Sequence, residues 1–202
     1  MIRGRLIAFE GLDQSGKQTQ ARRLREMLEA DGHIVVSFDF PDYQTPIGME
    51  IGEALAGRRA FPPDCLQLLY VANRCEHRPA IEAALAAGQW VVCDRYLASS
   101  IAYGDAQGLD PAWLELIQRV LPPADITVLL DIAPADAAHR KQQHRDAFEQ
   151  DLDLLARVRA SYLRQAVVTP GWHIVDAARD RDEVTRDIAA FLEDHVGDSR
   201  DD

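Results

Sequence analysis

Two glycines and a lysine near the start of the chain have the spacing of a phosphate-binding loop. The stretch FEGLDQSGKQTQ, which begins at residue 9, places four residues between Gly11 and the pair Gly16–Lys17. In such a loop the backbone N–H groups surround phosphate oxygens and the lysine ammonium neutralises them. Gln18 stands where the pattern expects a serine or threonine hydroxyl that binds Mg²⁺. The stretch predicts a nucleoside triphosphate site in which Lys17 bridges the β- and γ-phosphates.

The spacing alone is a weak signal, because a glycine-rich turn with a solvated Lys17 would also satisfy it. Its context favours the phosphate site. The apolar run RLIAF (5–9) precedes the loop, and Ala21, Leu24 and Leu28 follow it at helical spacing. A strand, a glycine loop and a helix N-terminus in this order point N–H groups at an anion. The loop and helix residues expected to bind ATP are Gly11, Asp13, Gln14, Ser15, Gly16, Lys17, Gln18 and Thr19.

A metal site is expected beside this loop. Mg²⁺ prefers hard oxygen ligands in tight octahedral geometry. The carbonyl of Gln18 is neutral and extends further than a hydroxyl, so it is expected to contribute weakly or not at all, and Thr19 is one residue off the ligand position. Asp94, which ends the apolar stretch WVVCD (90–94), is therefore expected to be the main protein carboxylate near the metal. Phosphate oxygens and water would supply most other ligands.

Short apolar runs alternate with helical patterns along the chain. Strands are expected at 5–9, 34–38, 90–94, 125–132 and 172–176. Helices are expected from residue 17 to Gly32, at 62–88 with an interruption near Pro79, after a cap at Asp110, from 134 to about 143, at 151–168 and at 182–195. This α/β alternation is typical of a parallel sheet covered by helices on both faces. Ligands bind such sheets at the carboxyl ends of the strands, which makes neighbours of the first loop, 40–43 and 94–96.

Composition limits the partners of this chain. Its 202 residues include 33 acidic and 22 basic side chains, for a net charge of -11. A chain this acidic is not expected to bind a nucleic-acid backbone or an anionic membrane by bulk attraction. No segment approaches the ~20 apolar residues of a membrane span, and no signal peptide is expected. Cys65, Cys75 and Cys93 form no paired motif and are expected to be reduced, buried thiols of a cytoplasmic protein.

Five stretches together resemble the thymidylate kinase family. They are FEGLDQSGKQTQ, FPDY, LLYVANR, CDRYLASSIAY and RDAFEQDLDLLARVRASYL, in the same order over residues 9–163. DRY followed by SSIAY, with ANR about twenty residues earlier, is far more specific than the phosphate loop. The resemblance implies a three-layer P-loop NTPase fold with a five-stranded parallel sheet, in one domain spanning 1–196 with a lid near 140–150. Residues 197–202 are expected to be a disordered tail.

The resemblance also implies an activity, the transfer of the γ-phosphate of MgATP to dTMP to give dTDP, and usually a homodimer. It assigns dTMP binding to Asp13, Phe40, Tyr43, Tyr70, Arg74, Arg95, Ser99, Ser100 and Tyr103. Arg95 would hold the acceptor phosphate, Tyr70 would stack on the pyrimidine and Arg74 would donate to base O4. Asp13 would accept from the sugar 3′-hydroxyl, and Tyr103 would occupy the place of a ribose 2′-hydroxyl. Packing or structural ion pairs remain the alternative roles for these five side chains.

The FPDY stretch departs from the family pattern, in which many members carry an arginine near the acceptor phosphate. Asp42 and Tyr43 occupy this neighbourhood here. A carboxylate repels a phosphate, so Asp42 is expected to point away, and the Tyr43 hydroxyl to donate in place of the arginine. Tyr96 is expected to support the neighbouring loop by packing.

Positive charge for the transition state is expected from the lid, because Gln14 and Ser15 leave the phosphate loop without an arginine. By resemblance, Arg140 would stack on adenine, Arg145 would fold over the phosphates and Glu149 would lie near the metal, with Lys141 or His144 as further lid candidates. The catalytic set expected is Lys17, Asp94, Arg95 and Arg145. A solvated loop is the alternative for this segment.

Two other functions remain open at this stage. One is a kinase of another nucleoside monophosphate or a small metabolite on the same fold. The other is a nucleotide-binding switch without turnover, for which Gln18 is the best support.

Overall fold

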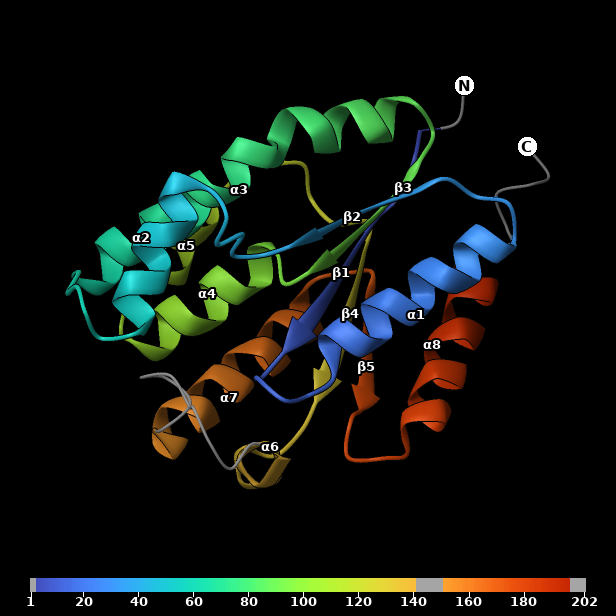
Figure 1. Cartoon of the computed structure of the whole chain (residues 1–202). Helices are drawn as coiled ribbons and strands as arrows, with labels where there is room; N and C mark the ends of the chain where they lie inside the picture. Colours follow the sequence, from blue (N-terminus) through green and yellow to red (C-terminus); the bar gives the residue numbers. More distant parts are fainter. Residues whose placement is uncertain (1–2, 141–150, 197–202) are drawn as a thin grey trace.

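The computed structural model describes residues 3–140 and 151–196, and its described strands form one parallel sheet (Figure 1). The strand order is β2-β3-β1-β4-β5. The strands are β1 (Leu6–Gly11), β2 (Val35–Asp39), β3 (Trp90–Asp94), β4 (Ile126–Asp131) and β5 (Trp172–Asp176). The five predicted strands and the predicted fold class are confirmed; β3 and β5 have the predicted bounds, and those of β1, β2 and β4 are shifted by one or two residues.

Helices cover both faces of this sheet. They are α1 (Lys17–Ala30), α2 (Pro46–Leu55), α3 (Pro63–Ala86), α4 (Leu97–Ala106), α5 (Pro111–Ile117), α6 (Pro134–Arg140), α7 (Leu152–Val168) and α8 (Arg181–Val196). Figure 1 shows α1 and α8 on one side of the sheet and α3, α4 and α7 on the other. The predicted cap at Asp110 is present, because Asp110 accepts from the Ala112 N–H. Asp151 caps α7 in the same way by accepting from the Leu154 N–H.

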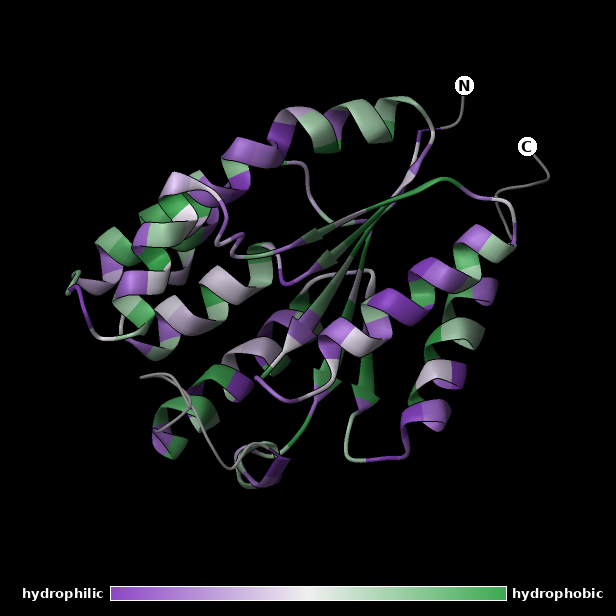
Figure 2. Ribbon diagram, viewed as in Figure 1, coloured by the Kyte–Doolittle hydropathy of each residue, from purple (hydrophilic) through white to green (hydrophobic). Residues whose placement is uncertain are grey.

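The core follows from the alternation of side chains along each strand. β1 is buried along its whole length, as expected of the central strand in a parallel sheet. Its residues Ile7 and Phe9 pack in the cluster that contains Leu24 of α1, whereas Leu6 and Ala8 pack in a cluster with Ile81 of α3. Figure 2 shows the hydrophobic strands between helices that carry both hydrophobic and hydrophilic turns. The sheet is therefore the rigid layer on which the loops are placed.

Three helical predictions were wrong or incomplete. The predicted interruption near Pro79 is absent, because α3 runs unbroken from Pro63 to Ala86. Pro79 lies on the exposed side of the helix, and the turns around it are fixed by buried Val71 and Ile81. This packing outweighs the ~3 kcal/mol that a proline costs a helix interior. Helices α2 and α4 were not predicted, although Thr45 caps α2 directly before Pro46.

The register aligns the carboxyl ends of three strands. Phe9 and Asp39 both lie beside Asp94. The Arg95 N–H donates to the Phe9 carbonyl and the Phe40 N–H donates to the Asp94 carbonyl, each at 2.9 Å. The phosphate loop, residues 40–43 and residues 94–96 are therefore neighbours, as the sequence predicts.

Several other expectations concern solvent exposure and the ends of the chain. Cys65, Cys75 and Cys93 are free thiols, but only Cys93 is buried, and the other two are partly exposed on α3. Among the described residues, no helix has the length and the apolar composition needed to cross a membrane. Most of the predicted lid (about 140–150) and the whole predicted tail (197–202) lie outside the described residues.

Candidate active site

The phosphate loop has the backbone that its glycines predict. Gly11 has φ +137°, and a Cβ there would lie 2.5 Å from the Leu130 carbonyl oxygen. Gln14 adopts the left-handed region with φ 65°. The loop turns directly into α1, whose first residue is Lys17, and no side chain among the described residues caps its first N–H groups. These uncapped donors can bind a phosphate, as expected of a helix N-terminus.

Lys17 lies at the centre of this loop. Its Nζ donates to the Leu12 carbonyl at 2.8 Å and lies 3.9 Å from Asp13 Oδ1. Burial, followed by repulsion from Arg95, lowers the pKa of Lys17 to about 8. The ammonium is thus held with little solvent around it, where a phosphate would gain most from its charge.

A cavity opens above this loop and is called the larger cavity. Its volume is about 1550 Å³, and residues 13–19 line it together with Asp94, Arg95 and Arg140. Gly11 does not line the cavity and instead shapes the turn. Gln18 and Thr19 both face this space. Every other described residue predicted for ATP is therefore brought to one cavity.

The charged lining of the larger cavity is balanced. Six lining side chains are cationic and six are acidic: Lys17, Arg23, Arg95, Arg140, Arg179 and Arg181 against Asp13, Asp39, Asp42, Asp94, Asp180 and Asp182. Because the whole chain carries a net charge of -11, this balanced lining repels an anion less than the average surface of the chain does.

Three buried polar atoms of residues that line this cavity have no hydrogen-bond partner among the described residues. They are Ser15 Oγ, Asp94 Oδ1 and His77 Nε2, the last of which lies 3.1 Å from the Asp42 carboxylate. Burial raises the pKa of Asp94, although Lys17 and Arg95 act in the opposite direction. A carboxylate oxygen without a partner at the end of β3 fits a hard divalent cation, which takes oxygen ligands.

The smaller cavity, of about 90 Å³, lies between α2, α3 and α4. All nine residues predicted for dTMP line it, together with Pro41, Leu55 and Gln67. Arg74 lies buried at its wall, where its Nη1 donates to Ser100 Oγ at 2.9 Å and to Gln118 Oε1 at 3.3 Å. Burial lowers the pKa of this guanidinium. Tyr70 and Arg74 are one turn apart on α3 and share the cavity, as predicted.

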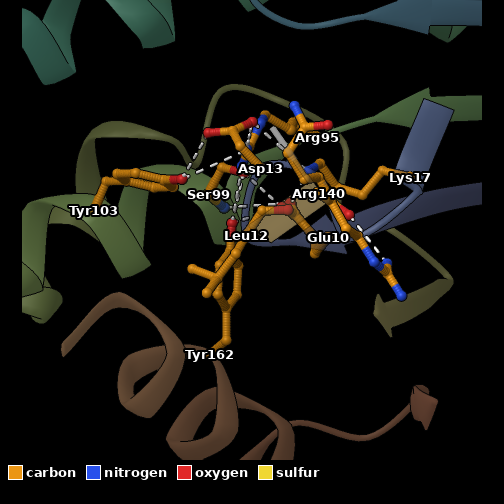
Figure 3. Close-up of polar contacts among 10 residues, drawn as sticks. Glu10, Leu12, Asp13, Lys17, Arg95, Ser99, Tyr103, Arg140 and Tyr162 are labelled. Carbon is orange, nitrogen blue, oxygen red and sulfur yellow. Dashed lines mark hydrogen bonds and ion pairs between the residues drawn. The ribbon is translucent and has the colours of Figure 1, made fainter. Parts of the chain in front are cut away.

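The two cavities share Arg95 and Asp13 in their linings, and Figure 3 shows these two side chains next to each other. Arg95 Nη2 lies 2.6 Å from Asp13 Oδ1, and the guanidinium carbon lies 5.3 Å from the centre of the Tyr103 ring. Although burial alone would lower the pKa of Arg95, the charge of Asp13 raises it well above its usual value. Arg95 has φ 63°, a left-handed conformation that costs energy outside glycine. A rigid surrounding structure must hold it.

That support comes from Glu10, which the sequence analysis did not identify. Glu10 is fully buried in β1 and accepts from the Tyr96 N–H at 2.8 Å, the Ser99 N–H at 3.2 Å and the Ser99 hydroxyl at 2.5 Å. The Tyr162 hydroxyl of α7 donates to the same carboxylate at 3.1 Å. Figure 3 shows Glu10, Ser99 and Tyr162 beneath Asp13 and Arg95. An acidic residue inside an apolar strand is the signal that could have revealed this role.

Asn73 is a second residue whose role the sequence did not show. It is fully buried on α3, accepts from the Asp42 N–H at 2.8 Å and donates to the Asp42 carbonyl and to Thr45 Oγ1. It thereby ties the loop before α2 to α3. The Asp42 carboxylate lies 3.1 Å from His77 Nε2, although Asp42 also lines the larger cavity.

Some of the remaining predicted residues lie in the described part of the chain, and others lie outside it. Tyr96 is fully buried, and its hydroxyl donates to the Pro122 carbonyl at 2.9 Å, so it packs as expected. Arg140 donates to the Ala177 and Gln14 carbonyls at 2.7 and 3.1 Å. Lys141, His144, Arg145 and Glu149 lie outside the described residues, so their predicted roles are not tested.

Comparisons with known proteins agree with this geometry. A family model described as thymidylate kinase matches residues 9–188. The thymidylate kinase of Arabidopsis thaliana is 34% identical over 194 residues, covering 96% of this chain and 73% of its own length. The human thymidylate kinase is 32% identical over 195 residues, covering 96% of this chain and 92% of its own length.

The solved structure of another thymidylate kinase has the same fold as this chain. Thymidylate kinase from Candida albicans, whose substrate specificity is described as broad, superposes with a TM-score of 0.82 at 31% identity. The match covers 96% of this chain and 92% of that chain. With the family model matching nearly the whole chain and the phosphate loop in place, this chain belongs to the thymidylate kinase family.

Proposed function

We propose that the larger and smaller cavities hold ATP and dTMP end to end, with the reaction centre at Asp13 and Arg95. The chain is a dTMP kinase that transfers the γ-phosphate of ATP to dTMP, giving ADP and dTDP. One observation carries the assignment of its site. Five residues, Asp13, Phe40, Pro41, Tyr43 and Arg95, line both cavities, so two nucleotides would meet there.

The donor side would work through main-chain groups and Lys17. The uncapped N–H groups of α1 and the Lys17 ammonium would hold the β- and γ-phosphates. Gln18 and Thr19 would lie beside the phosphates, and Arg140 would cover the adenine.

The acceptor side would work through side chains. Tyr70 would stack on the pyrimidine and Arg74 would donate to O4, while Asp13 would accept from the 3′-hydroxyl. Arg95 would direct the acceptor phosphate toward the γ-phosphate. The attacking oxygen is already ionised, so positioning and positive charge suffice without a general base.

Mg²⁺ would bind at Asp94, because that carboxylate presents a buried oxygen without a partner among the described residues. Bound metal would neutralise phosphate charge. The balanced lining of the larger cavity provides no surplus of formal positive charge, counting histidine as neutral, so a polyanion there needs added cations. This supports the metal and the predicted lid cation Arg145. By resemblance, Glu149 would lie near this metal.

Three further properties are proposed from the resemblance and the composition. The chain would form a homodimer, act in the cytoplasm and bind no nucleic acid. Sedimentation of the purified protein would test the first, since a single species at monomer mass would contradict it.

Coupled assay of ADP release with Mg²⁺ and ATP tests the main proposal. We expect dTMP to support turnover with a kcat/KM at least about tenfold above that of CMP or AMP. Equal turnover of all three would favour a broader nucleoside monophosphate kinase, and no dTMP-dependent ADP would favour a switch. The comparisons favour neither alternative. Lys17→Met serves as the inactive control.

A further inference from the structure

Gln67 is a buried polar side chain that neither the phosphate loop nor the family motifs account for. It lies on α3, is 1% exposed and lines the smaller cavity. Its side-chain Oε1 is buried without a hydrogen-bond partner among the described residues. The side-chain NH2 group likewise makes no hydrogen bond to any residue in 3–140 or 151–196. Nearly all buried polar groups in folded proteins have a partner, so this exception calls for an explanation.

Its position relates it to the base-binding residues. Gln67, Tyr70 and Arg74 follow one another at spacings of three and four, which places them on one face of α3. Gln67 and Arg74 are separated by roughly 10 Å along the helix axis, with Tyr70 between them. By the usual direction of helical side chains, Gln67 and Arg74 both lean toward the helix N-terminus, and both line the smaller cavity together with Tyr70. Both polar groups can therefore reach a ring stacked on Tyr70.

The chemistry of the two groups is complementary. A guanidinium only donates hydrogen bonds, and Arg74 Nη1 already donates to Ser100 Oγ and Gln118 Oε1. A primary amide presents an acceptor and a donor side by side. A thymine ring presents the reverse pair, the N3–H donor beside a carbonyl acceptor. After Arg74 takes O4, the N3–H and O2 remain to be paired.

We infer that the Gln67 amide hydrogen-bonds the N3–H and O2 edge of the pyrimidine and acts as a specificity-determining residue for the acceptor nucleotide. The inference rests on the proposed function, because it needs dTMP in the smaller cavity. Leucine at this position would fill similar space without an unpartnered amide. The chain thus gives up stability at Gln67 for a contact made only with the bound base.

The first experiment compares Gln67→Leu with wild type in thermal unfolding and steady-state kinetics. We expect Tm to stay equal or rise, because an unpartnered buried amide is removed. We expect KM for dTMP to rise roughly 3- to 10-fold, the value of one neutral hydrogen bond, with kcat and KM for ATP within about twofold. An unchanged KM for dTMP beside a raised Tm would overturn the inference.

Controls separate this outcome from general damage. Gln165→Leu removes a partly buried glutamine whose amide donates to the Ala98 carbonyl and which lines neither cavity. This variant should lose stability without changing KM for dTMP. If Gln67→Leu does not fold, Gln67→Met keeps the length of the side chain and tests the same point.

The second experiment tests direct contact with N3-methyl-dTMP, in which the ring donor is blocked. Wild type should prefer dTMP over this analogue, and the preference should shrink about 3- to 10-fold in Gln67→Met. An identical preference in both proteins would contradict contact with N3–H. Wild type without dTMP turnover would refute the proposed function itself, whereas an active wild type with unaffected variants would refute the inference alone.

Discussion

The two cavities are lined by different kinds of groups. The larger one, about 1550 Å³, is lined by phosphate-loop backbone and by charged groups with both signs. The smaller one, about 90 Å³, is lined by side chains that already bond to one another, as Arg74 does to Ser100 and Gln118. Main-chain donors recognise phosphate, which every nucleotide carries, whereas fixed side chains can distinguish bases and sugars.

This difference predicts which of the two substrates each substitution should affect. Changes in the smaller cavity should alter which acceptor is used and leave the donor alone. Changes at Lys17 should alter donor binding whatever the acceptor. Arg95 and Asp13 lie where the cavities meet, so they give the most severe test of this division.

Arg95→Ala should have the largest effect. It removes the cation proposed to hold the acceptor phosphate, together with the 2.6 Å ion pair between Arg95 and the Asp13 carboxylate. We expect kcat/KM for dTMP to fall at least about 100-fold, with KM for ATP changed by less than about threefold. Kinetics with each substrate varied in turn measure both values. Equal losses for the two substrates would break the division between the cavities.

Raising the pH should weaken ATP binding through Lys17. Its pKa of about 8 lies below the ordinary 10.5, so the ammonium loses its proton as pH rises through 8, and bound phosphates favour the charged form. ATP affinity should fall up to about tenfold per pH unit above 8. Calorimetric titration between pH 7 and 9.5 measures this. The same shift makes the unfolding free energy, measured without ATP, rise by up to about 1.4 kcal/mol per unit from pH 8 to 10.5.

Lys17→Arg is the matched control for this effect, because a guanidinium stays charged over the whole range. Its ATP affinity should be lower but independent of pH above 8. A pH dependence as steep as that of the wild type would assign the effect to another group.

Tyr103→Ala should reduce discrimination at the sugar. The ring is 9% exposed, lines the smaller cavity and its hydroxyl lies 3.4 Å from Asp13 Oδ2. Removing the ring should reduce the preference for dTMP over ribothymidine monophosphate by about tenfold. Tyr103→Phe keeps the bulk and should stay within about threefold of wild type. Unchanged discrimination in the alanine variant would leave Tyr103 a packing role.

Tyr162→Phe should have the smallest effect. It deletes a hydroxyl that accepts from Arg95 Nη1 at 3.3 Å, lies 2.9 Å from Ser99 Oγ and donates to Glu10 Oε2 at 3.1 Å. Urea unfolding should show a loss of about 1–3 kcal/mol, and KM for dTMP should rise about threefold. An equal rise in KM for ATP would show that Tyr162 supports the whole site and not the acceptor side.

The sequence predicted the sheet and the neighbours at its edge because both depend on local patterns. Apolar runs marked all five strands, and glycine spacing marked the phosphate loop, whose Gly11 indeed needs its φ of +137°. The predicted helix interruption at Pro79 was wrong because the tertiary packing of α3 outweighs the local tendency of proline to break a helix. Helix α4 was missed because its stretch LASSIAYGDA is mostly small or apolar, without clear amphipathic spacing.

The site was predicted where motifs exist and missed where only the fold creates a partner. All nine acceptor residues reached one cavity because they belong to motifs with fixed spacing. Nothing in the local sequence states that Glu10 meets Tyr162, which lies 152 positions away, or that the Gln67 oxygen has no partner among the described residues. The sequence analysis considered a structural ion pair only as an alternative to phosphate binding by Arg95. The structure shows such an ion pair, between Arg95 and Asp13, and both residues also line the two cavities.

The carboxylate of Glu10 has a consequence for local opening of the chain. The first amides of a helix usually exchange with solvent quickly, because the helix end frays. Here the Tyr96 and Ser99 amides are bound by a fully buried group of the central strand. Their hydrogens should exchange with deuterium about as slowly as those of β1, so that the start of α4 unfolds only together with the sheet.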